Sequence, residues 1–150
     1  MMDEATAVEL ELRDAYRFAV RFGPDGAGAL LTDLGPPLGT GAGPDSEQLL
    51  VAAVANCLSS SLLFSLRKFR NDAVPIRTAA AATLSRNAAG RLRVSGIEVD
   101  ICLGVAASAI RQLDRALVQY EDFCVVTQSV RAAIPVVVRV HDSSGAVLTP

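Results

Sequence analysis

The sequence predicts a single α+β domain that spans residues 1–150. Segments of period-two alternation lie towards both ends of the chain, and one long segment of helical periodicity lies between them. A chain of 150 residues is also long enough to bury a core of its own. We therefore expect strands, a long helix, a β-hairpin, two further helices and a last strand, in that order.

The N-terminal third is predicted to form strands. In "AVELELRDAYRFAVRFG", residues 7–23, apolar and polar residues alternate, which indicates a strand pair or one long bent strand. A turn is expected at "GPDGAG", residues 23–28, and a short strand at "ALLTDL", residues 29–34. The Gly- and Pro-rich residues 35–46, "GPPLGTGAGPDS", predict a loop before the helix.

Residues 45–72, "DSEQLLVAAVANCLSSSLLFSLRKFRND", have the spacing of one long helix. Asp45 or Ser46 can cap its N-terminus, where Glu47 suits the helix dipole. The spacing predicts Cys57 in the middle of the buried stripe. That stripe would consist of Leu50, Ala53, Val54, Cys57, Ser61 and Phe64.

The remaining residues predict a hairpin, two helices and a strand. Residues 78–105 indicate two strands that turn near 87–90, and residues 106–123 an amphipathic helix. A second short helix is expected over 124–134, with Cys124 at its start, and a last strand at "PVVVRVHD", residues 135–142. One face of the second hairpin strand would carry Ile97, Val99, Ile101 and Leu103.

Composition argues against several classes of partner. The chain has 14 basic and 16 acidic residues, so no strongly basic surface for nucleic acid is expected. The acidic N-terminus lacks the pattern of a secretory signal, and no apolar run reaches the roughly 20 residues that span a membrane. The sequence therefore predicts a cytoplasmic protein with no nucleic-acid or membrane partner.

The candidate chemistry rests on three cysteines. They form no Cys-x-x-Cys motif, and the single histidine, His141, supplies few metal ligands, so neither a metal nor another cofactor is expected. Cys57 is either a small core residue or a nucleophile, which would need a cation from Arg13, Arg17 or Arg21. We expect Cys102 to be structural and His141 to be solvated at a strand end.

Around Cys57 the sequence resembles the OsmC/Ohr family, the osmotically inducible and organic hydroperoxide resistance proteins. The stretch "DSEQLLVAAVANC" is similar to the family signature, with Glu47 ten positions before Cys57, and "LGPPLGTGAGPDSEQLL" is similar to its lead-in. Cys124 holds the place of the family's second cysteine. The chain departs from the pattern at Cys124-Val125, which replaces Cys-Pro, and at Asp45-Ser46, which replaces Asn-Pro.

The resemblance, which covers about residues 18–140, implies a thiol peroxidase that reduces organic hydroperoxides. Cys57 would attack the peroxide, Cys124 would form a disulfide with it, and an external dithiol would reduce that disulfide. Arg17, or alternatively Arg21, would stabilise the Cys57 thiolate, and Glu47 would orient the arginine. The resemblance also implies an intertwined homodimer.

Two other functions remain open at this point. The same fold could serve a non-catalytic protein that binds a hydrophobic small ligand at the dimer interface, or a structural dimer without a ligand. Helix geometry adds a constraint, because ten residues separate Glu47 and Cys57 by about 15 Å along a straight helix. The two residues can share a site only if the helix breaks between them or if they come from different subunits.

Overall fold

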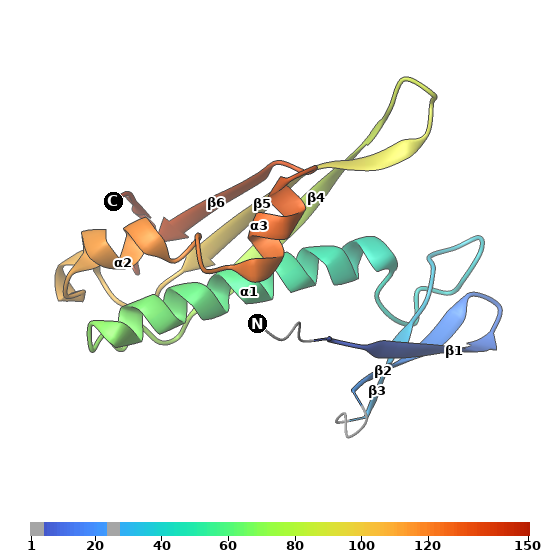
Figure 1. Cartoon of the computed structure of the whole chain (residues 1–150), viewed down its shortest axis with the longest axis horizontal. Helices are drawn as coiled ribbons and strands as arrows, with labels where there is room; N and C mark the ends of the chain where they lie inside the picture. The colour runs from blue at the N-terminus through green and yellow to red at the C-terminus, as the bar shows by residue number, and fades with distance from the viewer. Residues whose placement is uncertain (1–4, 24–27) are drawn as a thin grey trace. The chain divides into compact units, whose positions relative to one another are not determined.

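The computed structural model describes residues 5–23 and 28–150 (Figure 1). Its contacts divide the chain into two compact units, residues 1–49 and 50–150, which we describe in turn. Each unit contains one β-sheet. The long helix begins at the end of the first unit and continues into the second, which also contains the shorter helices. The predicted α+β class is confirmed.

The first unit contains a three-stranded antiparallel sheet in the order β1-β2-β3. Its strands are β1 (Val8–Asp14), β2 (Arg17–Phe22) and β3 (Ala29–Thr32). The first segment is thus a strand pair and not one bent strand, because Ala15 takes a left-handed φ of 44° in the turn between β1 and β2. Most of the predicted turn at 23–28 lies outside the described residues.

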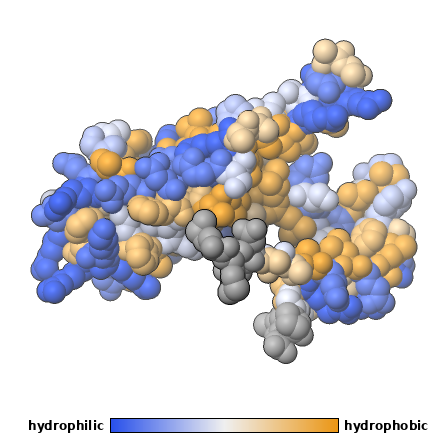
Figure 2. Space-filling view, in the orientation of Figure 1, coloured by the Kyte–Doolittle hydropathy of each residue, from blue (hydrophilic) through white to orange (hydrophobic). Residues whose placement is uncertain are grey.

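Pairing in this sheet separates apolar from charged side chains. Val8, Leu10 and Leu12 of β1 alternate with Glu9 and Glu11, so the two kinds of residue lie on opposite faces. The three apolar residues are between 51% and 58% exposed. Figure 2 shows both hydrophobic and hydrophilic residues at the surface of this unit.

Helix α1 (Ser46–Lys68) begins at the end of the first unit. Asp45 caps it, because its carboxylate accepts a hydrogen bond from the backbone N–H of Gln48 at 2.8 Å. The Gln48 side chain accepts one in return from the Asp45 backbone N–H at 3.0 Å, which completes a capping box. Of the two predicted caps, Asp45 is the correct one, and α1 runs without interruption past Cys57.

The second unit contains a four-stranded sheet in the order β4-β5-β6-β7. Its strands are β4 (Arg77–Arg86), β5 (Leu92–Cys102), β6 (Val136–His141) and β7 (Val147–Leu148). The predicted hairpin joins β4 to β5, and the Asn87 side chain closes its turn by accepting from the backbone N–H groups of Ala89 and Arg91. Strand β6 pairs with β5 in parallel.

The helical segment after β5 is shorter than predicted. It contains a 3₁₀ turn at Ala107–Ala109 and then α2 (Leu113–Gln119), in place of one helix over residues 106–123. Gln112 interrupts the helix because its φ is 53°, in the left-handed region. Helix α3 (Val125–Arg131) follows, as predicted, directly after Cys124.

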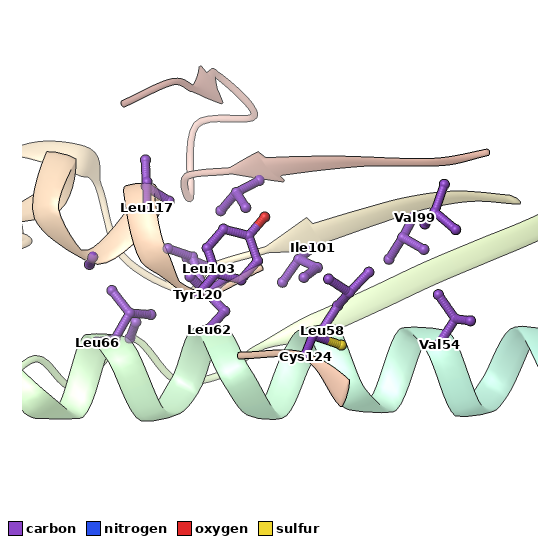
Figure 3. Packing of buried hydrophobic residues seen from close by; sticks show 14 of the residues in the cluster. Val54, Leu58, Leu62, Leu66, Val99, Ile101, Leu103, Leu117, Tyr120 and Cys124 are labelled. Carbon is purple, nitrogen blue, oxygen red and sulfur yellow. The ribbon is translucent and has the colours of Figure 1, made fainter. Parts of the chain in front are cut away.

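The core of the second unit lies between α1 and the sheet (Figures 1 and 3). On β5, Ile97, Val99 and Ile101 share one buried face, as their alternation predicts. They pack with the fully buried stripe of α1, which consists of Val54, Leu58, Leu62 and Leu66.

The predicted stripe of α1 is wrong in its centre. Cys57 is only partly buried at the edge of the stripe, and Phe64, one of its predicted members, is 72% exposed. Small or apolar residues occur on nearly every side of α1, so their spacing alone could not identify the side that packs.

By length and composition, α1 could also cross a membrane, because an 18-residue window within it has a mean hydropathy of 2.0. The expectation that no segment is long and apolar enough is therefore wrong for this helix. The core helix of a folded domain passes the same test, and α1 packs Leu58 and Leu62 into the core that it shares with β5.

Candidate functional site: two adjoining thiols and a paired arginine

Cys124 lies at the N-terminus of α3 and is completely buried. Its backbone is extended, with φ −80° and ψ 93°, so the chain changes direction at this residue before the helix begins. The Cys124 thiol donates a hydrogen bond of 2.9 Å to the Thr127 hydroxyl, which is also completely buried. In Figure 3 Cys124 lies beside Leu58 of α1, within the hydrophobic core.

The structure brings Cys57 and Cys124 together. Burial, and second a hydrogen bond with the Cys57 thiol, raise the pKa of Cys124 above its ordinary value. Cys57 is the more accessible of the two, since it is partly exposed while Cys124 is not. A partly exposed thiol beside a buried thiol is an arrangement in which a disulfide can follow oxidation of the outer one.

Cys102 lies apart from this pair, exposed at the end of β5. His141 is paired across the sheet with Cys102 and places its Nε2 2.8 Å from the Asp100 carboxylate. The expectation of a merely solvated histidine is therefore wrong, because Asp100 and Arg139 surround it with a charged network. In the part of the chain that the structure describes, no cluster of three or more potential ligands could hold a metal ion.

Arg17 lies in the first unit, on β2, and its guanidinium is held by three side chains. Its Nη2 donates to the Thr40 hydroxyl at 3.1 Å, and its Nη1 lies 3.5 Å from the Asp14 carboxylate. Its Nε is buried, lies 3.8 Å from Asp33 Oδ2, and has no hydrogen-bond partner within the described residues. This cation therefore has donor capacity that these partners leave unused.

Asp33 organises the loop that follows β3. Its carboxylate accepts hydrogen bonds from the backbone N–H groups of Leu34, Thr40 and Ala42 and from the Thr40 hydroxyl. These bonds, with that of the Thr40 hydroxyl foremost, lower the pKa of Asp33 to about 2. Gly39 is required within this loop, since a Cβ there would collide with the Leu34 carbonyl and the Asp33 carboxylate. The loop after β3 therefore folds around the buried Asp33 carboxylate.

The other residues predicted for the site are surface residues in the structure. Arg21 lies 3.5 Å from Glu9, with half of its side chain exposed, and Arg13 pairs with Glu11. Glu47 is exposed in the first turn of α1, and it forms no ion pair with Arg17 within residues 5–23 and 28–150. Of the three candidate arginines, Arg17 is the most shielded from solvent.

The first unit also contains a cavity of about 290 Å³ next to the start of α1. Leu10, Phe18 and Leu49 line it with apolar surface, while Asp33 and Ser46 are among its polar residues. A hollow of this size and character can hold a small, mainly apolar molecule.

Sequence reasoning missed two residues that touch the predicted ones. Thr127 stands three positions after Cys124, which is the spacing at which side chains meet in the first turn of a helix, and that spacing could have identified it. Asp33 is a carboxylate just before a Gly- and Pro-rich loop, where unsatisfied backbone N–H groups are common. Its contact with Arg17 depends on how the loop folds and has no signature in the sequence.

Comparison with known proteins identifies the family and the fold. The family of OsmC-like proteins matches residues 39–139, and no curated protein sequence matches the chain. An OsmC-like protein of unknown function from Vibrio cholerae has the same fold with a TM-score of 0.75 at 18% identity, over 92% of this chain and 99% of that one.

Two further structures of organic hydroperoxide resistance proteins also share the fold. OsmC from Legionella pneumophila has a TM-score of 0.70 at 15% identity, over 93% of this chain and 98% of that one. OhrB of Bacillus subtilis has a TM-score of 0.66 at 15% identity, over 91% and 98%. Because the family match covers about two thirds of the sequence, the chain belongs to the OsmC-like family.

Proposed function

We propose that this protein reduces organic hydroperoxides by a two-cysteine cycle. The observation that supports this most directly is that Cys57, at the edge of the hydrophobic core, is close enough to the buried Cys124 thiol to raise its pKa. Structural relatives named organic hydroperoxide resistance proteins support the same reaction class.

The difference in burial supports different roles for the two thiols. Cys124 is fully buried and its pKa is raised, so it remains a protonated thiol at neutral pH. Cys57 is partly exposed and can be reached by a substrate, so Cys57 is the attacking residue and Cys124 the resolving one. Apolar neighbours of Cys57, such as Val54 and Leu58, favour an alkyl or lipid hydroperoxide over hydrogen peroxide.

The chemistry then follows in three steps. The Cys57 thiolate attacks the peroxide, the O–O bond breaks, and an alcohol leaves after it takes up a proton, while Cys57 becomes a sulfenic acid. The Cys124 sulfur attacks the Cys57 sulfur and forms a disulfide, and the hydroxyl group leaves as water with the proton of the Cys124 thiol. An external dithiol reduces the disulfide by exchange and is itself oxidised to a disulfide.

Arg17 is the cation that we assign to the Cys57 thiolate. Its guanidinium is held by Thr40 and Asp33, and it is the most shielded of the three candidate arginines, so solvent screens its charge least.

We further propose that the functional form is a homodimer. Because α1 continues without a break from Ser46 to Lys68, Glu47 and Cys57 of one chain stay about 15 Å apart along the helix axis. Glu47 can therefore share a site with Cys57 only if the two residues come from different subunits.

A peroxidase assay with an alkyl hydroperoxide and a dithiol tests this function. We expect turnover by the unmodified protein and none by Cys57→Ser, because serine lacks a thiolate and cannot form the sulfenic acid. Cys102→Ser is the matched control. It removes an exposed thiol at the last residue of β5 and should leave turnover unchanged.

Equal losses in both serine variants would mean that the cysteines support folding and not the reaction. Absence of turnover in the unmodified protein, together with saturable binding of an apolar ligand, would instead favour the non-catalytic alternative.

A further inference from the structure

We propose that Thr127 is a positioning residue for the resolving step: it holds the Cys124 thiol in place and stabilises the negative charge that develops on the sulfur as the thiol loses its proton. This inference rests on the proposed two-cysteine cycle. It assigns a role to a buried hydroxyl in α3 that takes no part in the attack on the peroxide.

The contact itself is specific. The Thr127 hydroxyl and the Cys124 sulfur lie 2.9 Å apart, and neither residue is exposed to solvent. Within the described residues, Cys124 is the one hydrogen-bond partner of the Thr127 hydroxyl. A hydroxyl placed in an apolar core without a partner would destabilise the protein, so this polar group is accommodated because the thiol is there.

A hydroxyl suits both states of the resolving cysteine. In the reduced protein the Cys124 thiol donates to the Thr127 oxygen, which fixes the direction in which the sulfur points. As the thiol gives up its proton and its sulfur attacks Cys57, negative charge develops on the sulfur, and the Thr127 O–H can turn and donate a hydrogen bond to it. The hydrogen bond from Thr127 thus lowers the pKa of Cys124, against the effects of burial and of Cys57.

The charged and titratable groups around Cys124 leave this role to Thr127. Cys57 faces it from α1, and Tyr120 and Glu121 precede it at the end of α2. Arg131 of α3 is bound to the Glu121 carboxylate at 2.6 Å, so its charge is already paired. The residues of β5 on the core side are apolar. Among these neighbours the Thr127 hydroxyl lies 2.9 Å from the Cys124 sulfur, and the hydroxyl and the backbone N–H of Thr127 both lower the pKa of Cys124.

Thr127→Val tests the role, because valine has nearly the same shape and lacks the hydroxyl. After one equivalent of cumene hydroperoxide, we expect the Cys57 sulfenic acid to form at the unmodified rate. Disulfide formation should slow by about tenfold, and its pH profile should move to higher pH. Thr127→Ser should restore both the rate and the profile, and it also reports on any packing defect of the valine variant.

Ser129→Ala is the matched control, since it removes from the same helix a hydroxyl whose hydrogen bond, among the described residues, goes to the Val125 carbonyl. Its disulfide formation should match that of the unmodified protein. Unchanged disulfide formation and an unchanged pH profile in Thr127→Val would overturn the proposal.

A second measurement separates this inference from the proposed function. In a Cys57→Ala, Cys102→Ser background Cys124 is the single thiol, and its ionisation can be followed by thiolate absorbance without any peroxide. Addition of Thr127→Val should raise the pKa of Cys124. Such a rise without any disulfide in the unmodified protein would support the contact but refute the cycle. No rise would refute the role of Thr127 even if the cycle operates.

Discussion

Cys57 and Cys124 differ chiefly in how far water reaches them. The same sulfur chemistry is available to both, but of the two only Cys57 is partly open to solvent, and burial keeps the proton on Cys124. A similar contrast separates Arg17 from Arg21, because Arg17 is shielded and held by Asp33 while Arg21 is exposed and pairs with surface carboxylates. At the scale of single residues, burial decides which of several identical groups can act.

The lowered pKa of Asp33 predicts how the stability of the protein depends on pH. Its pKa is lowered from 3.8 to about 2 in the folded state, so its hydrogen bonds stabilise the protein fully above pH 4. That stabilisation is lost as the pH falls from about 4 to about 2, since the protonated carboxyl accepts these bonds poorly. Asp33→Asn should lower the urea midpoint at pH 7, and its difference from the unmodified protein should shrink below pH 3.

Urea unfolding at pH 7, 4 and 2.5 would measure this. Asp72→Asn, which changes an exposed carboxylate between α1 and β4, is the control and should leave the midpoint unchanged. A constant difference between the Asp33→Asn and unmodified proteins at all three pH values would contradict the account.

At the scale of elements, the start of α1 depends on a single reciprocal pair. Asp45 and Gln48 bond to each other's backbone N–H groups, and both groups would otherwise lack a partner. Asp45→Ala should therefore lower the free energy of unfolding by about 1 kcal/mol. Chemical unfolding followed by circular dichroism measures this change.

The neighbouring Ser46→Ala variant is the control for the cap. Ser46 is exposed, and its side chain makes no hydrogen bond among the described residues, so its loss should have an effect close to zero. Equal destabilisation by the two variants would show that the cap is not specific to Asp45.

How well the sequence predicts an element depends on how its residues alternate. Strand β5 alternates strictly, and the buried set at Ile97, Val99 and Ile101 could be predicted from it. Helix α1 is apolar or small on nearly all sides, so Phe64 was assigned to the core although it is exposed. The interruption of the helix predicted over 106–123 depends on the left-handed backbone of Gln112, just before α2, a residue type that gives no signal of such a turn.

The candidate site was predictable in part for the same reason. Cys57 and Cys124 could be identified because their spacing and flanking residues resemble a known family, and the position of Thr127 three residues after Cys124 was a usable signal, whereas the contact of Asp33 with Arg17 exists only in the folded chain. The pairing of His141 with Asp100 likewise depends on the parallel register of β5 and β6, which no local pattern encodes.

At the scale of the whole molecule, assembly is the property that a single chain leaves open. Strand β1 carries an exposed apolar row at Val8, Leu10 and Leu12, and Phe64 of α1 is also exposed, which is surface of a kind usually covered by a partner. We predict a dimer, since a second subunit would also bring Glu47 close to Cys57.

Sedimentation equilibrium at micromolar concentration measures the assembly. The expected mass is twice the 15.7 kDa of one chain, independent of dilution over this range. A folded species of 15.7 kDa would rule out the dimer, and with it the role of Glu47 at the site.

The proposed reaction cycle depends on one covalent bond, and peptide mapping by mass spectrometry under non-reducing conditions tests for that bond most directly. After one equivalent of an alkyl hydroperoxide, we predict a peptide pair joined by a disulfide between Cys57 and Cys124, with Cys102 still free. Cys57 oxidised to sulfinic acid while Cys124 remains a free thiol would contradict the two-cysteine cycle.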